Sequence, residues 1–179
     1  MKTLSLASYP HLHTGRELAT ACNGSKTILL CGQASSSSKL AIAKALANEN
    51  QGKKVLYIDC DVSGTISAKH NASETDVPIP SQSQMETEQN LSVVHLQNPI
   101  GKRVKRLLQE SVSGYAQVVV SIASSTESKP EFVFPVMTDT LILLPGNQGQ
   151  RQLKTLMDQI YDRDYTIAGI IEADTIPNL

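Results

Sequence analysis

A lysine and two acidic residues are placed so that they could act on the phosphates of a nucleotide. Lys39 directly follows a run of four serines, and Asp59 and Asp61 come at the end of a second apolar run. A phosphate-binding loop works through backbone N–H groups, the N-terminus of the following helix, a lysine and a Mg²⁺ ligand. Asp59 and Asp61 are therefore the candidates for catalysis and for metal binding. Weak binding of ATP, ADP or another anion is expected at Ser35, Ser36, Ser37, Ser38 and Lys39.

The same segment departs from this chemistry in its loop. A phosphate loop uses glycines because glycine permits positive φ angles and a close approach of the backbone to the phosphate, whereas serine tolerates this poorly. Leu40 stands where a Mg²⁺-binding hydroxyl is expected, and leucine offers no oxygen ligand. We therefore expect the scaffold of a nucleotide-binding protein with an impaired site.

Each of these residues also has a purely structural interpretation. Lys39 is either a phosphate ligand or a solvated lysine in the first turn of a helix. One of the serines 35–38 is either part of an anion site or the N-cap of that helix, which is the commoner role of serine before a helix. Asp59 and Asp61 either belong to a site at the carboxyl end of a strand or cap the loop that follows it.

The composition is that of a globular chain without an electrostatic preference for nucleic acid. The 179 residues carry a formal net charge of −1 and are 40% hydrophobic, so one domain with a real core is expected. There is no overall basic field, and no apolar run is long enough to insert into a membrane. Cys22, Cys31 and Cys60 lack the spacing of a metal site, which indicates small buried residues in a reducing, cytosolic compartment.

Apolar runs alternate with amphipathic segments along the chain. Strands are expected over 26–31, 55–58, 91–96, 117–122, 140–144 and 166–171. Helices are expected over 15–22, 37–51, 100–111 and 148–163, and a short connector over 132–137. Residues 64–90 are polar and are expected to form a long loop. The pattern predicts an α/β three-layer sandwich with a mainly parallel sheet, organised as an N-terminal segment (1–25) and a single domain (26–179).

The order of these motifs resembles that of the MinD/ParA-type P-loop ATPases. Among them the chain is most similar to the cytoplasmic domain of the bacterial tyrosine kinases that pair with polysaccharide co-polymerases. The resemblance runs from about residue 15 to residue 173 and rests mainly on order and spacing. Its motifs are the loop 33–40, the strand 55–61 that ends in Asp-x-Asp, and the strands 115–123, 138–146 and 168–172.

The resemblance also indicates which parts of the family's site this chain lacks. Ser36 and Ser38 stand at the family's loop glycines, and Ser121 stands at the carboxylate of its Walker B motif. Glu172 stands where the family has an asparagine that contacts adenine. Lys39 and the Asp-x-Asp pair remain, so the resemblance implies a degenerate member with a P-loop NTPase-like fold.

Three functions follow from the resemblance. The first is a catalytically impaired relative that acts as an accessory or regulatory subunit in bacterial exopolysaccharide biosynthesis or export. Its partner would be a membrane polysaccharide co-polymerase, a related ATPase or a second copy of the chain. The alternative is an active but atypical ATPase or protein tyrosine kinase, and the second alternative is a MinD/ParA-like positioning protein. The accessory or regulatory subunit would be a cytoplasmic protein that reaches the inner membrane through its partner. It would have no nucleic-acid partner and would not insert directly into the membrane.

Overall fold

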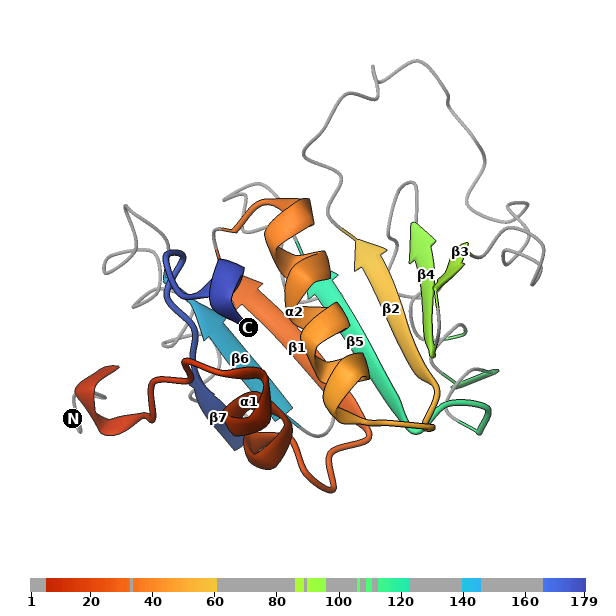
Figure 1. Ribbon diagram of the computed structural model, residues 1–179, viewed down its shortest axis with the longest axis horizontal. Helices are drawn as coiled ribbons and strands as arrows, with labels where there is room; N and C mark the ends of the chain where they lie inside the picture. Colours follow the sequence, from red (N-terminus) through yellow and green to blue (C-terminus); the bar gives the residue numbers. More distant parts are fainter. Residues whose placement is uncertain are drawn as a thin grey trace, which may run out of the picture.

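The computed structural model describes residues 6–32, 34–60, 86–88, 90–95, 106, 109–110, 113–122, 140–145 and 166–179. Within them, helices lie against a sheet of mainly parallel strands (Figure 1). The strands are β1 (Thr27–Gly32), β2 (Val55–Cys60), β3 (Glu86–Glu88), β4 (Leu91–His95), β5 (Gln117–Ile122), β6 (Thr140–Leu144) and β7 (Thr166–Ile170). The helices are α1 (Gly15–Ala21), α2 (Ser36–Glu49) and the short 3-10 helices η1 (Leu6–Ser8) and η5 (Ile176–Asn178).

The strands of the described residues form one sheet in the order β3-β4-β2-β5-β1-β6-β7. All neighbouring pairs are parallel except β3 and β4, which are antiparallel. Each of the expected strands is confirmed, with small differences in where it begins or ends. The expectation of an unbroken loop over 64–90 is wrong at Glu86–Glu88, because these residues pair with β4 as a short edge strand.

The central strands are built from residues that suit a sheet covered on both faces. β1, β2 and β6 are buried along their whole length. A strand that is apolar on both faces is typical of a parallel sheet with helices above and below it. Because β1 lies between β5 and β6, the loop that follows β1 lies at the centre of the carboxyl edge of the sheet.

Helices α1 and α2 lie on the same face of the sheet (Figure 1). Their inward side chains, among them Leu18, Ile42 and Leu46, are fully buried in the hydrophobic core. A capping box begins α1: the Thr14 hydroxyl accepts from the N–H of Glu17 at 3.2 Å, and the Glu17 carboxylate accepts from the N–H of Thr14 at 3.2 Å. In the part of the chain that the structure describes, helices fall short of the length and apolar content needed to cross a membrane.

The segment before α1 lies along the outer edge of β7. The N–H of Leu12 donates to the oxygen of Ile170 at 2.8 Å, and the N–H of Ile170 donates to the oxygen of Pro10 at 2.9 Å. Gly169 permits this approach, because a Cβ atom there would lie 2.8 Å from the Leu12 side chain and from the Pro10 oxygen. Leu12 and Cys22 thus join the same core as the strands. The division into a segment over 1–25 and a domain over 26–179 stays a prediction.

Several expected elements fall largely outside the described residues. The helix over 100–111 is described at residues 106, 109 and 110, which are helical, and Arg106 lies 2.9 Å from Glu110 there. The helix over 148–163 and the connector over 132–137 lie outside the described residues, as do residues 64–85 and 89 of the expected loop. The second helical layer of the expected sandwich depends on these helices, so the described residues show the sheet and one of its covering layers.

Candidate functional site

The loop at the expected phosphate position begins with a residue that must be glycine. Gly32 ends β1 with a φ angle of +136°, a conformation that other residues rarely adopt. A Cβ atom at this position would lie 1.9 Å from the main-chain oxygen of Leu144, the last residue of β6. The close packing of the two strand ends therefore excludes a side chain at Gly32.

The serines after this glycine begin α2. Ser35 is the N-cap, and its hydroxyl oxygen accepts from the N–H of Ser38 at 3.1 Å. The same oxygen lies 2.9 Å from the hydroxyl oxygens of Ser37 and Ser38. The N-cap interpretation is thus confirmed for Ser35, while Ser36 and Ser38, at the family's glycine positions, are helical residues. Anion binding by the four serines and Lys39 stays a prediction.

Lys39 is fully buried in the first turn of α2. The interpretation of Lys39 as a solvated lysine is therefore wrong. Its charge acts on Cys31, near the end of β1: burial raises the pKa of the Cys31 thiol to about 12, and the positive charge of Lys39 acts in the opposite direction.

Asp59 on β2 lies beside Ser121 on β5, and Tyr57 completes a chain of three polar side chains. Asp59 and Ser121 are register partners in the parallel strand pair. The Ser121 hydroxyl donates to Oδ1 of Asp59 at 3.1 Å, and the Tyr57 hydroxyl donates to the Ser121 oxygen at 3.0 Å. Tyr57 and Ser121 are fully buried, and Asp59 is 7% exposed. Asp59 is therefore a strand residue and not a loop cap, and Asp61 lies outside the described residues.

Glu172, at the family's adenine position, faces the N-terminal segment. Its Oε1 atom lies 3.7 Å from Nδ1 of His11, and the His11 ring stacks on His13 with ring centroids 6.4 Å apart. Both members of the Glu172–His11 pair are close to half exposed, so water screens their interaction. The structure thus places Glu172 beside the segment that pairs with β7.

The fold is similar to that of solved structures, although no protein-family model and no curated protein matches the sequence. The kinase domain of the Escherichia coli tyrosine kinase ETK matches with a TM-score of 0.61 and 20% identity, over 87% of this chain and 70% of that one. A ParA family ATPase from Chlorobium tepidum TLS matches with a TM-score of 0.57 and 16% identity, over 82% of this chain and 72% of that one. A chain of the MinC:MinD cell division complex of Aquifex aeolicus matches with a TM-score of 0.52 and 18% identity, over 82% of this chain and 68% of that one.

These similarities have low sequence identity and cover most of the chain, so they decide the fold. The chain has the MinD/ParA-type P-loop fold. The prediction of an α/β, P-loop NTPase-like architecture with a mainly parallel sheet is thereby confirmed. In this fold β1 leads into α2 at the carboxyl edge of the sheet, and Asp59 and Ser121 lie near the carboxyl ends of the adjacent strands β2 and β5.

The P-loop fold implies a nucleotide with Mg²⁺, and the described residues do not fit this ion. Mg²⁺ requires several oxygen ligands in octahedral geometry. Leu40 provides none and packs against the core, and Oδ1 of Asp59 already accepts from Ser121. Among the described residues, no group of three or more His, Cys, Asp or Glu residues could hold a metal ion. The described residues therefore lack the set of oxygen ligands that Mg²⁺ requires.

Tyr57 is hydrogen-bonded to Ser121, the neighbour of the candidate residue Asp59, and is absent from the candidates that the sequence provides. It lies two residues before Asp59, and this spacing places both side chains on the same face of β2. A buried tyrosine hydroxyl usually has a hydrogen-bond partner. That pairing of a tyrosine and an aspartate on one face of a buried strand is the signal that could have identified it.

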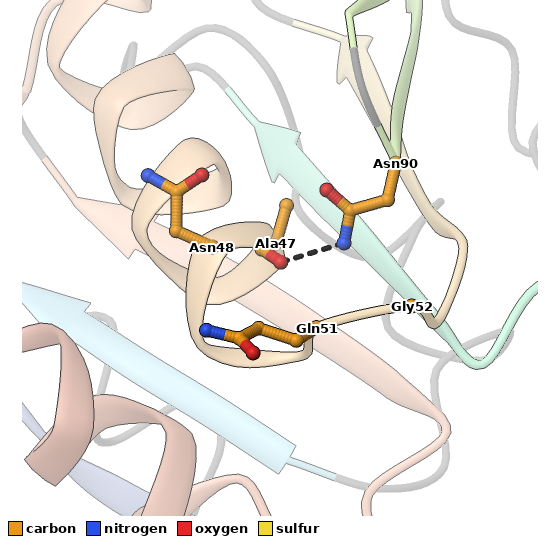
Figure 2. A pocket seen from close by; sticks show the side chains of 5 residues that line it. All are labelled: Ala47, Asn48, Gln51, Gly52 and Asn90. Atoms are coloured by element: carbon orange, nitrogen blue, oxygen red, sulfur yellow. Dashed lines mark hydrogen bonds between the residues drawn. The ribbon is translucent and has the colours of Figure 1, made fainter.

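A surface hollow of about 530 Å³ lies at the opposite edge of the sheet, away from the P-loop position (Figure 2). It is formed where α2 ends and where β2 and β4 begin, and its lining residues are Ala47, Asn48, Gln51, Gly52 and Asn90. The Asn90 side chain crosses this region and donates to the oxygen of Ala47 at 2.6 Å (Figure 2). Because none of the candidate site residues lines it, this hollow is separate from the P-loop site.

Proposed function

We propose that the chain is a catalytically impaired P-loop ATPase or tyrosine-kinase-like protein that acts as an accessory or regulatory interaction subunit. The observation that carries the proposal is the hydrogen bond from Ser121 to Asp59. A carboxylate at the Walker B position would place two acidic groups side by side, an arrangement that a cation stabilises. Ser121 instead donates a hydrogen bond to Asp59 and adds no charge. Phosphoryl transfer depends on metal-assisted stabilisation of charge, so this exchange disfavours catalysis.

The biological process in this proposal is bacterial exopolysaccharide biosynthesis or export. Its support is the resemblance of the motifs to the tyrosine kinases that pair with polysaccharide co-polymerases. The kinase domains of ETK and VpsO are among the similar solved structures, with TM-scores of 0.61 and 0.59. The partner would be a membrane polysaccharide co-polymerase, a related ATPase or a second copy of the chain. A protein that has the P-loop fold but not its nucleotide chemistry would act through contacts between its surface and a partner protein.

Titration of the purified chain with ATP and Mg²⁺ in a calorimeter tests this proposal, combined with an assay of phosphate release. We expect no binding in the micromolar range and no release of phosphate. A solved kinase domain of the same fold, such as that of ETK, is the positive control under the same conditions. Micromolar binding together with turnover would contradict the proposal.

An active but atypical ATPase or tyrosine kinase is the second candidate, and the buried position of Lys39 favours it. A fully buried lysine in the first turn of α2 lies next to the loop where a phosphate group would bind. This candidate uses Lys39, Asp59 and Asp61, so Lys39→Ala should abolish phosphate release. Lys44→Ala, on the exposed face of the same helix, is the matched control. Absence of phosphate release from the unmodified protein would remove this candidate.

A further inference from the structure

The outer edge of β7 is covered by a short stretch of the chain that precedes α1 (Figure 1). Among the described strands β7 is the last in the sheet, with β6 on its inner side. On its outer side, His11 forms an isolated parallel bridge with Ile170. Both main-chain groups of Ile170 face this stretch, since the N–H donates to the oxygen of Pro10 and the oxygen accepts from the N–H of Leu12. Residues 10–12 are called the edge segment below.

The edge segment fits against β7 through a notch at Gly169. A Cβ atom on Gly169 would lie 2.8 Å from Cγ of Leu12, 2.8 Å from the oxygen of Pro10 and 2.9 Å from Cδ1 of Leu12. These three nearest atoms all belong to the edge segment, and such short distances leave no room for a side chain. Neighbouring strands of an ordinary sheet accommodate a side chain at every position. The edge segment therefore lies closer to β7 than a regular strand would, and this approach depends on the glycine.

The two edges of the described sheet differ in how well they could pair with another chain. An edge strand presents unpaired N–H and C=O groups, and short length or charged side chains oppose its pairing with a further strand. At one edge, β3 is three residues long and two of them are glutamates. At the other edge, β7 is five residues long and carries no charged side chain. The β7 edge is thus the one that most needs a cover.

We propose that the edge segment keeps the outer edge of β7 from pairing with β7 of a second copy of the chain. The segment occupies both main-chain groups of Ile170 and is anchored by Leu12, which is 4% exposed and belongs to the hydrophobic core. A second copy presents the same edge, so two chains without this cover can pair their β7 strands about a twofold axis, which closes as a dimer. The inference is independent of the proposed function, because it concerns the edge of the sheet and not the P-loop site.

The first test is Gly169→Ala, which displaces the edge segment from β7 and still leaves β7 able to pair with a regular strand. Sedimentation or light scattering measures the average mass over about a hundredfold range of protein concentration, and we expect it to rise up to about twofold above that of the unmodified protein. Gly15→Ala is the matched control, because a Cβ atom there would lie at an ordinary 3.4 Å from Cγ of Glu49. The unmodified protein is the reference throughout, so self-association through another surface does not affect the comparison.

Hydrogen exchange of the Ile170 amide locates the change, because the acceptor of this N–H belongs to the edge segment. In dilute Gly169→Ala we expect this amide to exchange faster by about tenfold or more. At the concentrations where the mass rises, pairing with a second copy should slow the exchange again. An increase in mass while the exchange stays fast would place the association at another surface and overturn the inference.

Leu12→Ser keeps the inference testable if Gly169→Ala does not fold. It weakens the anchor of the edge segment without adding an atom to β7, so the average mass should rise in the same direction. Adding Thr166→Lys to either variant should restore the mass of the unmodified protein, because Thr166 is an exposed residue of β7 and an edge lysine opposes strand pairing.

A loss of stability far from β7 provides the last control. Asn90→Ala removes hydrogen bonds between the start of β4 and the end of α2, and it should not raise the average mass. The inference is overturned if neither Gly169→Ala nor Leu12→Ser associates more than the unmodified protein. It is also overturned if their association survives Thr166→Lys or appears equally in Asn90→Ala, since general destabilisation would then be the cause.

Discussion

The side-chain nitrogen of Asn90 lies 2.6 Å from the main-chain oxygen of Ala47, which ties the start of β4 to the last turns of α2. The same nitrogen lies 2.9 Å from the oxygen of Lys53 and 3.3 Å from that of Asn50. The carbonyl groups at the end of a helix lack partners within the helix, so this amide satisfies groups that otherwise depend on water. One side chain thus connects the helix, the turn after it and the sheet.

Replacement of Asn90 should destabilise the protein. We expect Asn90→Ala to lower the free energy of unfolding by about 1–3 kcal/mol, because several part-buried carbonyl groups lose a donor together. Urea denaturation followed by circular dichroism measures this. Asn48→Ala, an exposed residue lining the same hollow, should change stability by less than about 0.5 kcal/mol. Equal effects of the two substitutions would contradict this role of Asn90.

A side chain at Gly32 should prevent the strands around the P-loop position from closing. In Gly32→Ala the new Cβ atom would meet the backbone oxygen of Leu144, which can retreat only if β1 and β6 separate. We expect a loss of about 4 kcal/mol or more, seen as low soluble yield or early thermal unfolding. Gly24→Ala is the matched control, since Gly24 also has a positive φ, of 82°, but has open space around it. Its cost should be about 1–2 kcal/mol, from backbone strain alone.

The N-cap of α2 should contribute measurably to stability. Ser35→Ala removes the acceptor of the Ser38 N–H, so we expect a loss of about 1 kcal/mol in the free energy of unfolding. Ser37→Ala removes an exposed hydroxyl that bonds only another serine hydroxyl in the described structure, and its effect should be smaller, below about 0.5 kcal/mol. Guanidinium denaturation of the two variants checks the order, and a reversed order would rule out Ser35 as the cap.

Two buried thiols should make the fold sensitive to alkaline pH. Burial raises the pKa of Cys22 and of Cys31 from 9.0 to about 12. Between these values the unfolded thiols lose their protons while the folded ones keep them, so the folded state binds more protons. The contribution of each thiol is therefore fully present below pH 9 and is lost progressively as pH rises towards about 12.

The slope of stability against pH isolates this effect from the loss of packing. Cys31→Ala should lower the free energy of unfolding at neutral pH, because it leaves a small cavity, and should make its decline between pH 9 and about 12 less steep. Urea denaturation over a series of pH values compares the slopes. Parallel curves for Cys31→Ala and the unmodified protein would show that this thiol does not titrate differently in the folded state.

The strands could be predicted from the sequence because their apolar runs depend on local composition alone. The runs beginning at Val55, Gln117 and Thr140 each form a strand that begins at that residue. The end of β2 was less predictable: Asp59 lies inside the strand, where it is the register partner of Ser121 on a different strand and accepts a hydrogen bond from its hydroxyl. That pairing depends on the order of the strands in the sheet, which the spacing of apolar residues along the sequence does not reveal.

The same reason explains the errors at the candidate site. A first-turn lysine is usually solvated, yet Lys39 is fully buried because the helix that carries it covers the centre of the sheet. The short strand at Glu86–Glu88 has a polar sequence, and its pairing with β4 gives it strand geometry despite that composition. Tertiary contacts, and not local preference, decided each of these positions.

The strand order also has a consequence for how the protein is made. On the ribosome β1 is synthesised before both of its neighbours, so Ile28 must wait for Val119 on one side and for Thr140 on the other. Leu12 waits longer still, for Ile170. Contacts between residues so distant in sequence form slowly, because a long loop must close before they contribute. The apolar side chains of β1 therefore stay exposed until β5 and β6 have been synthesised, and exposed apolar strands of this kind are prone to aggregation.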